Sequence, residues 1–325
     1  MRVLVTGSAG HLGEALVRTR QGSAIDVIGL DRKASPYTTH VGSIVDRAFV
    51  EKAMAGVDAV LHTATLHKPH VETHSRQAFV DTNVTGTLNL LEEAVRAGVR
   101  AFVFTSTTSV FGRALRPDAQ QPAAWITEEV RPVPRNIYGV TKAAAEDVCE
   151  LFHRDRGVPC LVLRTSRFFP EEDDDEAMRK AYDAENAKAN EFLYRRVDLE
   201  DVVAAHLLAL DRAPAIGFAR YIISATTPFL PEDVAGLRTD AAEVVRRRVP
   251  EYEAEYARRG WRMFPTIDRV YVNDRARREL GWQPHYDFRA VLTKLARNDY
   301  PRSELSAVIG SKGYHSPHQQ GRENT

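Results

Sequence analysis

The chain has 325 residues, with 44 lysines and arginines balanced by 44 aspartates and glutamates, so its formal net charge is zero. This balance excludes a global attraction to nucleic acid or to an anionic membrane surface. No apolar run approaches the ~18 residues needed to cross a bilayer, and the length fits one large domain or two closely associated ones.

The first residues and the cysteines indicate the compartment. The chain opens directly on a predicted strand at residues 2–6, which leaves no room for a secretion signal. Its two cysteines, Cys149 and Cys160, lack the spacing of a metal site. We expect them to be buried free thiols in a reducing environment, and we expect a cytoplasmic protein.

Short β-branched runs alternate with amphipathic segments of helical length. Strands are predicted at 3–5, 26–30, 59–61, 101–104, 160–163 and 221–223. Helices are predicted at 12–20, 75–97, 137–157 and 200–210, and further helices follow residue 226 and end with 273–280 and 287–296. Apolar strands separated by helices predict a parallel sheet covered on both faces. The sequence therefore predicts a doubly wound α/β Rossmann fold, with ligands at the carboxyl ends of the strands.

A glycine-rich turn, Thr-Gly-Ser-Ala-Gly-His-Leu-Gly, links the first strand to the first helix at residues 6–13. Gly7 permits the tight turn, Gly10 lets the backbone approach a pyrophosphate, and Gly13 lets the helix pack closely on the strand. The amides of His11 and Leu12 begin the helix, where the dipole favours an anion. The turn predicts a dinucleotide site.

Asp31 ends the second strand. There it can accept hydrogen bonds from both adenosine ribose hydroxyls, and its charge repels a 2′-phosphate, so NAD is favoured over NADP. Arg32 and Lys33 blur this preference, because one of them could pair with such a phosphate. The alternative is that Asp31 caps a turn.

Tyr138 and Lys142 are four residues apart in a predicted helix, so they share one face of it. An ammonium near the phenol stabilises the phenolate and lowers a pKa that is ordinarily near 10. The pair predicts proton transfer to or from an alcohol or a ketone.

From these elements we expect a NAD-binding Rossmann domain at 1–165, to which 197–224 returns. A smaller, mostly helical substrate-binding region is expected at 166–196 and 225–300, and a C-terminal tail at 301–325, frayed or wrapped around a partner subunit. The acidic run at 171–176 predicts a solvated helix start, rather than a site for a divalent metal.

The order and spacing of these motifs resemble the extended short-chain dehydrogenase/reductase family, especially its nucleotide-sugar epimerase and dehydratase branch. The resemblance runs from Met1 to about Leu210 and reappears at residues 279–284, Glu-Leu-Gly-Trp-Gln-Pro. It implies NAD as the cofactor and Thr107, Tyr138 and Lys142 as the catalytic set. Thr107 would bind the reacting oxygen, and Lys142 would also bind the nicotinamide ribose. Further cofactor contacts implied by the family pattern are Ser43, Ile44, Thr63, Ala64, Thr65 and Asn83.

The resemblance also separates possible reactions. Sugar dehydratases of the family carry an Asp-Glu pair directly after the catalytic threonine, whereas this chain has Thr108-Ser109, so dehydration is disfavoured. An epimerase and a dehydrogenase share the first half-reaction, and the catalytic residues do not separate them. Arg167 stands where nucleotide-sugar enzymes commonly have an asparagine, and the segment that embraces the nucleotide is short, which favours a smaller sugar, as in uronate dehydrogenases.

Two clusters could face the substrate. Arg167, Arg195 and Arg196 could clamp an anion, or they could pair with the acidic run. His67 and His70 follow the predicted cofactor turn, with His62 and His74 nearby, and could contact substrate, lie in a solvated loop or bind a metal. Thr108, His67, Arg167 and Arg196 are the predicted substrate contacts, and no metal site is predicted.

Three functions remain open at this stage. The first is a NAD-dependent sugar epimerase, the second a dehydrogenase of a smaller sugar, uronate or sugar phosphate, and the third a non-catalytic NAD-binding subunit. The family pattern also implies a homodimer formed through the helices near 75–97 and 137–157.

Overall fold

The computed structural model describes residues 1–20, 25–118, 120–173 and 175–313. Its centre is a seven-stranded sheet in the order β3-β2-β1-β4-β5-β7-β8, in which all neighbouring strands are parallel. The strands are β1 (Arg2–Thr6), β2 (Asp26–Asp31), β3 (His40–Val41), β4 (Ala59–His62), β5 (Ala101–Thr107), β7 (Cys160–Thr165) and β8 (Phe218–Ile223). The predicted doubly wound fold is therefore confirmed.

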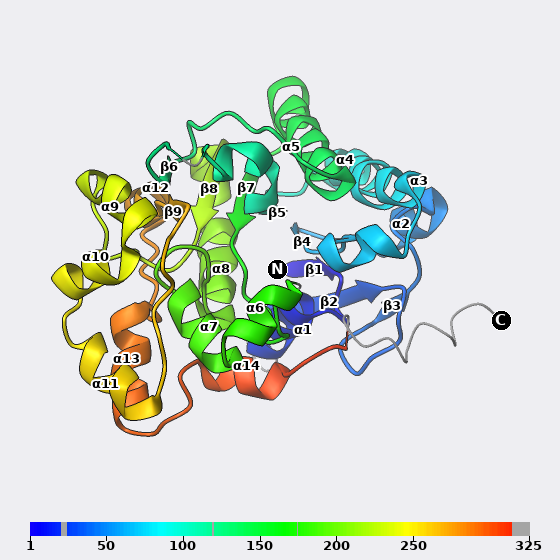
Figure 1. Cartoon of the computed structure of the whole chain (residues 1–325). Coiled ribbons are helices and arrows are strands. Elements are labelled where there is room, and N and C mark those ends of the chain that lie inside the picture. Colours follow the sequence, from blue (N-terminus) through cyan, green and yellow to red (C-terminus); the bar gives the residue numbers. More distant parts are fainter. Residues whose placement is uncertain (21–24, 119, 174, 314–325) are drawn as a thin grey trace.

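Helices cover both faces of the sheet (Figure 1). Those that pack on one face are α1 (His11–Arg20), α8 (Leu199–Ile216), α12 (Asp274–Leu280) and α14 (Glu304–Ile309). Those on the other are α2 (Arg47–Ala53), α4 (Gly86–Ala97) and α5 (Ile137–Arg156). Side-chain alternation explains the two layers, because Val3 and Val5 of β1 join the core under α1 and α8, whereas Leu4 joins the core under α2, α4 and α5.

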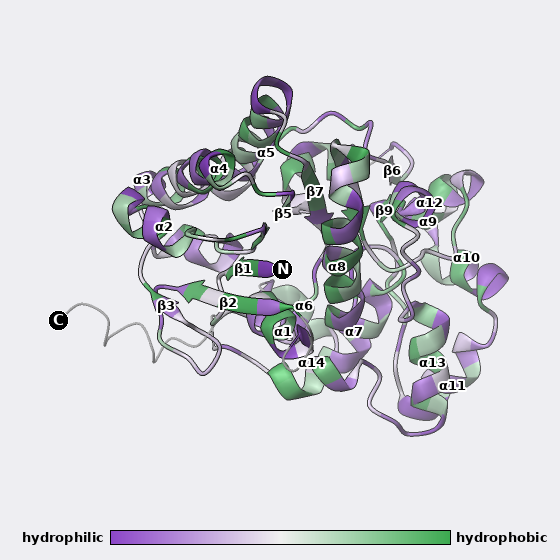
Figure 2. Cartoon of the chain, turned by 180° about the vertical axis from the view of Figure 1, so that it is seen from behind, coloured by the Kyte–Doolittle hydropathy of each residue, from purple (hydrophilic) through white to green (hydrophobic). Residues whose placement is uncertain are grey.

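A smaller region packs beside the sheet and holds its own apolar core. Two parallel strands, β6 (Ala124–Ile126) and β9 (Arg269–Tyr271), form a second sheet. The helices of this region are α6 (Glu176–Ala181), α7 (Ala184–Glu191), α9 (Val234–Thr239), α10 (Ala241–Arg248), α11 (Tyr252–Arg259) and α13 (Phe288–Ala296). Figure 2 shows that these helices carry both hydrophobic and hydrophilic residues, and the buried apolar ones form this core.

Short helical turns complete the fold: η1 (Lys68–Glu72), η2 (Asp81–Thr85), η3 (Thr108–Leu115) and η4 (Pro231–Asp233). The long helix predicted at 75–97 is divided, since α3 (Arg76–Val80) and α4 are joined by η2, a turn of π-helix that contains Asn83. Such turns widen a helix locally and are frequent at functional sites.

Residues 301–313, predicted as part of a tail, are packed on the fold in the structure. Ser303 and Ser306 bond to the buried carboxylate of Asp198, and α14 packs on α1 and α8. Residues 314–325 of the predicted tail lie outside the described residues. No helix in the described part of the chain combines the length and apolarity needed to cross a membrane.

The acidic run at 171–176 is also more than a solvated helix start. Glu171 is buried, and its Oε1 lies 3.0 Å from Nε2 of His11. Asp173 pairs with Arg195 at 2.7 Å. Asp175 and Glu176 act as the sequence predicts, since the Asp175 side chain accepts from the amide of Ala177 at the start of α6 and the exposed Glu176 lies in its first turn. Glu171 and Asp173 pair with side chains of other segments instead of facing solvent, because the fold brings His11 and Arg195 next to them.

Candidate active site

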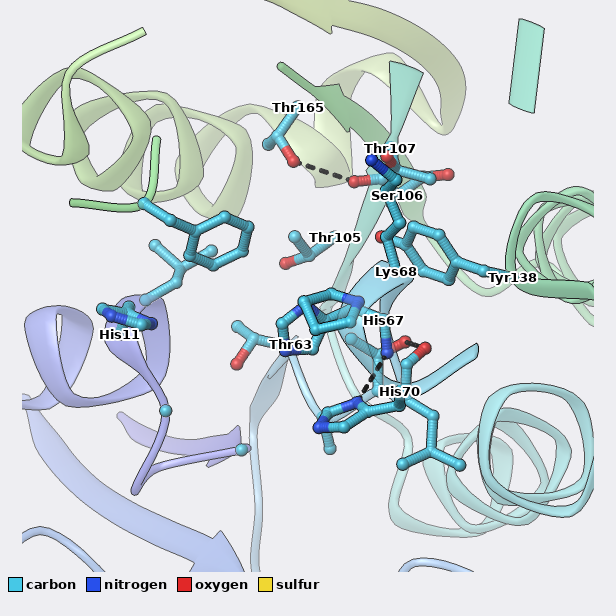
Figure 3. A pocket seen from close by; sticks show the side chains of 18 of the residues that line it. His11, Thr63, His67, Lys68, His70, Thr105, Ser106, Thr107, Tyr138 and Thr165 are labelled. Carbon is cyan, nitrogen blue, oxygen red and sulfur yellow. Dashed lines mark hydrogen bonds between the residues drawn. The ribbon is translucent and has the colours of Figure 1, made fainter. Parts of the chain in front are cut away.

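A cavity of about 730 Å³ opens at the carboxyl ends of the central strands. Its wall is made by the turn after β1, the ends of β2, β4, β5 and β7, the first turn of α5 and strand β9. Figure 3 shows His11 on one side and Thr107 and Tyr138 on the other, with Thr63 and His67 between them. The glycine turn and the tyrosine predicted from separate motifs therefore share one cavity.

The glycine turn lies against two neighbouring strands. Gly7 has a φ of +75°, and a side chain there would lie 2.7 Å from Thr63 Oγ1. A Cβ on Gly13 would lie 1.9 Å from the carbonyl oxygen of Gly7. Both positions need glycine, one for backbone conformation and one for the close approach of α1 to β1. Gly10, His11 and Leu12 line the cavity at the helix start.

Asp31 lines the cavity and also holds the turn. Its Oδ2 accepts from the amide of Ala9 at 3.0 Å, and its Oδ1 accepts from the amide of Lys33 at 2.9 Å. Asp31 therefore also caps a turn, which was the alternative interpretation, and these bonds hold its carboxylate beside the glycine turn. The predicted cofactor contacts that also line the cavity are Arg32, Ser43, Ile44, Thr63, Ala64 and Thr65.

Four predicted site residues are not among the described residues that line the cavity: Gly13, Asn83, Lys142 and Arg196. Asn83 is buried, and its amide joins the segment after β4 to α5. Its Oδ1 accepts from the amide of Leu66 at 2.9 Å, and its Nδ2 donates to the Leu66 carbonyl and to Thr141 Oγ1, both at 3.0 Å. The structure therefore gives Asn83 a bracing position behind the cavity wall.

Tyr138 lies in the first turn of α5. Asn136 caps this helix, and its side chain accepts from the amide of Gly139 at 3.0 Å. Burial raises the pKa of the phenol to about 12, although its hydrogen bond with Thr107 works in the opposite direction. Thr107 ends β5 and accepts from the amide of Ser109 at 3.1 Å. The hydroxyl and the phenol therefore face the same part of the cavity.

Lys142 departs from the sequence prediction. Its ammonium donates to the carbonyl of Thr105 at 2.6 Å and lies 3.9 Å from the centre of the Phe104 ring. Burial lowers the pKa of this ammonium to about 7, against the charge of Glu146, which raises it. The predicted lowering of the Tyr138 pKa by Lys142 is thus wrong for this arrangement, because burial of the phenol dominates.

A buried ion pair between Glu146 and Arg164 lies beside β5. Glu146, one turn beyond Lys142, accepts from Ser106 Oγ at 2.5 Å and from Arg164 Nη2 at 2.8 Å. Arg220 adds a contact at 3.2 Å. These groups are contributed by β5, β7, β8 and α5, so they fix the helix that carries Tyr138 against the strand that carries Thr107.

One of the four histidines is packed in the interior, and the other three lie along the turn after β4. His62 is buried, with its ring nitrogens 2.7 Å from Thr6 Oγ1 and 2.9 Å from Thr87 Oγ1. His67, His70 and His74 line the cavity instead. No group of three or more histidine, cysteine or acidic side chains suited to a metal ion occurs within the described ranges.

The three predicted arginines do not act together at the cavity. Arg167 and Arg195 line it and contact Asp173 Oδ2 at 3.5 and 2.7 Å. Arg196 is buried, and it donates to Glu191 Oε2 at 2.7 Å and to the carbonyl of Phe169 at 2.9 Å. Burial works against ionisation of Glu191, but the three arginines hold its pKa well below the ordinary value. Arg196 therefore lies behind the cavity wall and supports it without lining the cavity.

Several lining residues were not predicted from the sequence. Phe169 stacks on His67 with ring centres 5.4 Å apart and meets His11 edge to face at 5.2 Å. Arg269 and Tyr271 arrive from β9, and Lys68 from η1. A signal existed for Lys68, which neighbours His67, whereas β9 carries no motif.

The comparisons with known proteins agree with this geometry. Residues 3–219 match the model of the family described as "NAD dependent epimerase/dehydratase family". The chain is 28% identical over 330 residues to a UDP-glucose 4-epimerase of Rhizobium meliloti, covering 92% of this chain and 97% of that protein. It is 29% identical over 332 residues to a dTDP-glucose 4,6-dehydratase of Streptomyces antibioticus, covering 89% of each.

A solved structure is similar over nearly the whole chain. It is a short-chain dehydrogenase/reductase superfamily protein from Agrobacterium tumefaciens with bound NAD, which matches with a TM-score of 0.65 at 25% identity and covers 91% of this chain and 96% of its own. The glycine turn, the acid at the end of β2 and the tyrosine at the start of α5 fit the same cofactor. This chain belongs to the NAD-dependent epimerase/dehydratase family and is a NAD-dependent enzyme of the extended short-chain dehydrogenase/reductase type.

Proposed function

We propose that this enzyme epimerises a sugar by oxidising one hydroxyl to a transient ketone and reducing the ketone from the opposite face. The observation that carries the proposal is the shared cavity of Thr107, Tyr138 and the glycine turn. NAD, when bound, accepts the hydride of the carbinol carbon. The similarity to a UDP-glucose 4-epimerase supports a sugar or nucleotide sugar as substrate.

Each proposed residue has a distinct task. Gly7, Gly10 and the amides of His11 and Leu12 hold the pyrophosphate, and Asp31 holds the adenosine ribose. Tyr138 takes the hydroxyl proton, and Thr107 orients the same oxygen. Lys142 donates to the Thr105 carbonyl, and with NAD bound it would hold the nicotinamide ribose.

Dehydration is not part of the proposal. Thr108 and Ser109 follow Thr107, and both line the cavity. Neither hydroxyl supplies the strong acid and base that elimination of water from a keto sugar requires. A second candidate, a net dehydrogenase, is favoured by Arg167, whose position in the cavity suits an acidic sugar without a nucleotide.

One experiment separates the two candidates. The purified enzyme is incubated with single nucleotide sugars and free sugars, and products are resolved by chromatography while absorbance is followed at the NADH band. An epimerase forms the epimer without net NADH, whereas a dehydrogenase accumulates NADH in step with product. A Tyr138→Phe enzyme that still binds NAD but loses turnover by about 10²–10⁴-fold supports either reaction. Unchanged turnover in this variant would exclude both.

The assembly proposed with this function is a cytoplasmic homodimer. Val140 and Leu151 on α5 are half exposed, at 49% and 40%, and α4 lies beside this helix (Figure 1). Cys149 and Cys160 are buried thiols, which suits a reducing compartment. Light scattering at micromolar concentration would show twice the chain mass, and a monomer would contradict the dimer.

A further inference from the structure

Several threonines that line the cavity donate their hydroxyl hydrogens to the protein. Thr63 Oγ1 donates to the carbonyl of Thr6 at 2.7 Å, and Thr165 Oγ1 donates to the carbonyl of Ser106 at 2.9 Å. A carbonyl oxygen can only accept, so the hydroxyl has to be the donor in each bond. These hydroxyl oxygens therefore offer a ligand their lone pairs and not their hydrogens.

The hydroxyl of Thr105 faces a histidine whose hydrogen can be placed by the same reasoning. Thr105 Oγ1 lies 2.8 Å from Nε2 of His206, and Nδ1 of the same ring lies 2.8 Å from the carbonyl of Val202 in α8. Because this carbonyl can only accept, Nδ1 carries the hydrogen. Burial lowers the pKa of His206 to about 4, so the ring is neutral at pH 7. Nε2 is therefore the acceptor, and Thr105 donates to it.

Thr105 lies between the glycine turn and the residues proposed for the chemistry. The sheet order places β4 between β1, which leads into the glycine turn, and β5, which carries Thr105 and Thr107. Residues two apart on a strand share one side of it and lie about 7 Å apart. A dinucleotide with its pyrophosphate at the turn and its ring at the carbon beside Tyr138 has to pass Thr105, which lines the cavity there (Figure 3).

The main chain of Thr105 is held as well as its side chain. Its carbonyl accepts from the ammonium of Lys142 at 2.6 Å, and the residue pairs with Leu163 of β7 in the sheet. The side chain is partly exposed, and its hydrogen points to His206, so the lone pairs of Oγ1 are left for a ligand. A ligand N–H or O–H group fits this oxygen, whereas a ligand carbonyl would bring lone pairs against lone pairs.

We propose that Thr105 binds the nicotinamide half of NAD as a hydrogen-bond acceptor, and that His206 is the positioning residue that fixes it in this role. The donor is the carboxamide N–H or a hydroxyl of the nicotinamide ribose. Such a bond limits the rotation of the ring or of the ribose next to the reacting carbon, which favours the reactive geometry. The inference rests on the proposed function for the position of that carbon, whereas its test needs no sugar.

The test is a calorimetric titration with four ligands: ADP, ADP-ribose, NAD and the 3-acetylpyridine analogue of NAD, in which a methyl group replaces the amide nitrogen. The proteins are the wild type, Thr105→Val and Thr293→Val. Thr293 is exposed on α13, and its hydroxyl donates to the carbonyl of Arg289, so it is the matched control. Thr105→Val should weaken NAD binding by about 3- to 10-fold, as expected for one lost neutral hydrogen bond. It should leave ADP binding unchanged, and the control should change neither.

The ligands also identify the donor. If the amide donates, the wild type prefers NAD to the acetylpyridine analogue, Thr105→Val loses this preference, and ADP-ribose binds both proteins equally. If a ribose hydroxyl donates, Thr105→Val weakens NAD, the analogue and ADP-ribose alike. An unchanged affinity for NAD, or a loss of ADP affinity as large as that of NAD, would overturn the contact. If Thr105→Val loses NAD affinity while the wild type turns over no sugar, the contact stands and the proposed reaction falls.

Two substitutions of His206 test its positioning role. Glutamine can accept from Thr105 with its carbonyl oxygen and donate to Val202 with its amide, whereas leucine can do neither. His206→Leu should lose as much NAD affinity as Thr105→Val, and His206→Gln should keep most of it. A His206→Leu protein that binds NAD like the wild type would contradict the role of His206. If His206→Leu does not fold, the titrations of Thr105→Val and His206→Gln decide, since loss of NAD affinity in the glutamine variant to the level of Thr105→Val also overturns it.

Discussion

The two parts of the cavity are built by different means. The cofactor part is made of backbone: a glycine turn, the amides at the start of α1 and one carboxylate at the end of β2. The part proposed for the substrate, here called the substrate part, is made of side chains from η1, the segment after β7 and β9, and its arginines form ion pairs. Backbone sites depend on a few local residues with strict spacing. Side-chain sites depend on which distant segments meet, so they vary more freely between members of one fold.

The largest expected effect is on the backbone part. Gly13→Ala places a Cβ 1.9 Å from the Gly7 carbonyl, so α1 must move away from β1. We expect NAD affinity to fall by more than about 100-fold and the melting temperature to fall by roughly 5 °C. Calorimetric titration with NAD measures the first effect and a thermal scan the second.

Gly98→Ala is the matched control for this change. Gly98 has a φ of +64° and open space around its Cβ, so the substitution strains the chain without moving α1. The control should lose stability and keep its NAD affinity. An equal loss of NAD affinity in both variants would show that general destabilisation, rather than the shape of the turn, governs the cofactor part.

Lys142→Met tests the boundary between the two parts. Its ammonium is buried and its pKa is lowered to about 7, so the unfolded chain, in which the pKa is near 10.5, binds more protons between these values. Stability of the wild type should therefore rise as pH increases from 7 to about 10. Lys142→Met removes this dependence, and below pH 7 it should melt about 2–4 °C higher than the wild type.

The same variant should lose about 10²–10³-fold in kcat, because the nicotinamide ribose would lose the contact proposed for Lys142. Gain of stability with loss of turnover is the signature of a strained functional residue. Thermal scans from pH 6 to pH 10 and initial rates together check this. A variant that melts lower than the wild type at pH 6 would show that the bond to the Thr105 carbonyl outweighs the burial of the charge.

The sequence predicted what local spacing controls. Gly7, Gly13 and the pair Tyr138 and Lys142 follow from turn geometry and helical periodicity, and the alternation of apolar strands and helices predicted the sheet. It did not predict what tertiary contacts decide. Asn83, predicted as a cofactor contact, joins Leu66 to Thr141 through its side-chain amide.

Tertiary contacts also give two adjacent residues different positions. Arg195 and Arg196 are neighbours in the chain, and only the first of them reaches the cavity, because Glu191 holds the second in the interior. Arg269 could not be placed at all, since its position depends on β9 pairing with β6 across the second sheet. The residue pattern within one segment does not reveal which distant strand it pairs with.

Asp31→Asn has an intermediate effect and tests the cofactor part alone. The amide keeps one acceptor for the Ala9 N–H but loses the charge that binds the ribose hydroxyls and repels a 2′-phosphate. We expect NAD affinity to fall about 10-fold and NADP affinity to rise, with no change in the ratio of acidic to neutral sugar turnover. Titration of both cofactors measures this, with Asp26→Asn, an exposed acid of β2 paired with Arg2, as the control.

The smallest expected effect tests whether the two parts are independent. Glu171 belongs to the segment after β7, yet it pairs with His11 of the glycine turn and accepts from Ser311 Oγ at 3.0 Å and the Lys312 amide at 2.9 Å. Burial alone would raise the pKa of Glu171, but the bond to His11 and the Lys312 amide lower it to about 2. The carboxylate therefore contributes stability that is present above about pH 4.5 and is lost as pH falls toward 2.

Glu171→Gln should therefore lower the melting temperature by about 1–3 °C at pH 7, with the difference shrinking below pH 4.5. It should also weaken NAD binding by about threefold, because His11 lines the cavity and loses the partner that orients its ring. Calorimetric titration with NAD at pH 7 measures the coupling, and Glu172→Gln, the exposed neighbour, is the control. If NAD affinity is unchanged while stability falls, the segment after β7 supports the fold without acting on the cofactor part, and the two parts of the cavity are energetically separate.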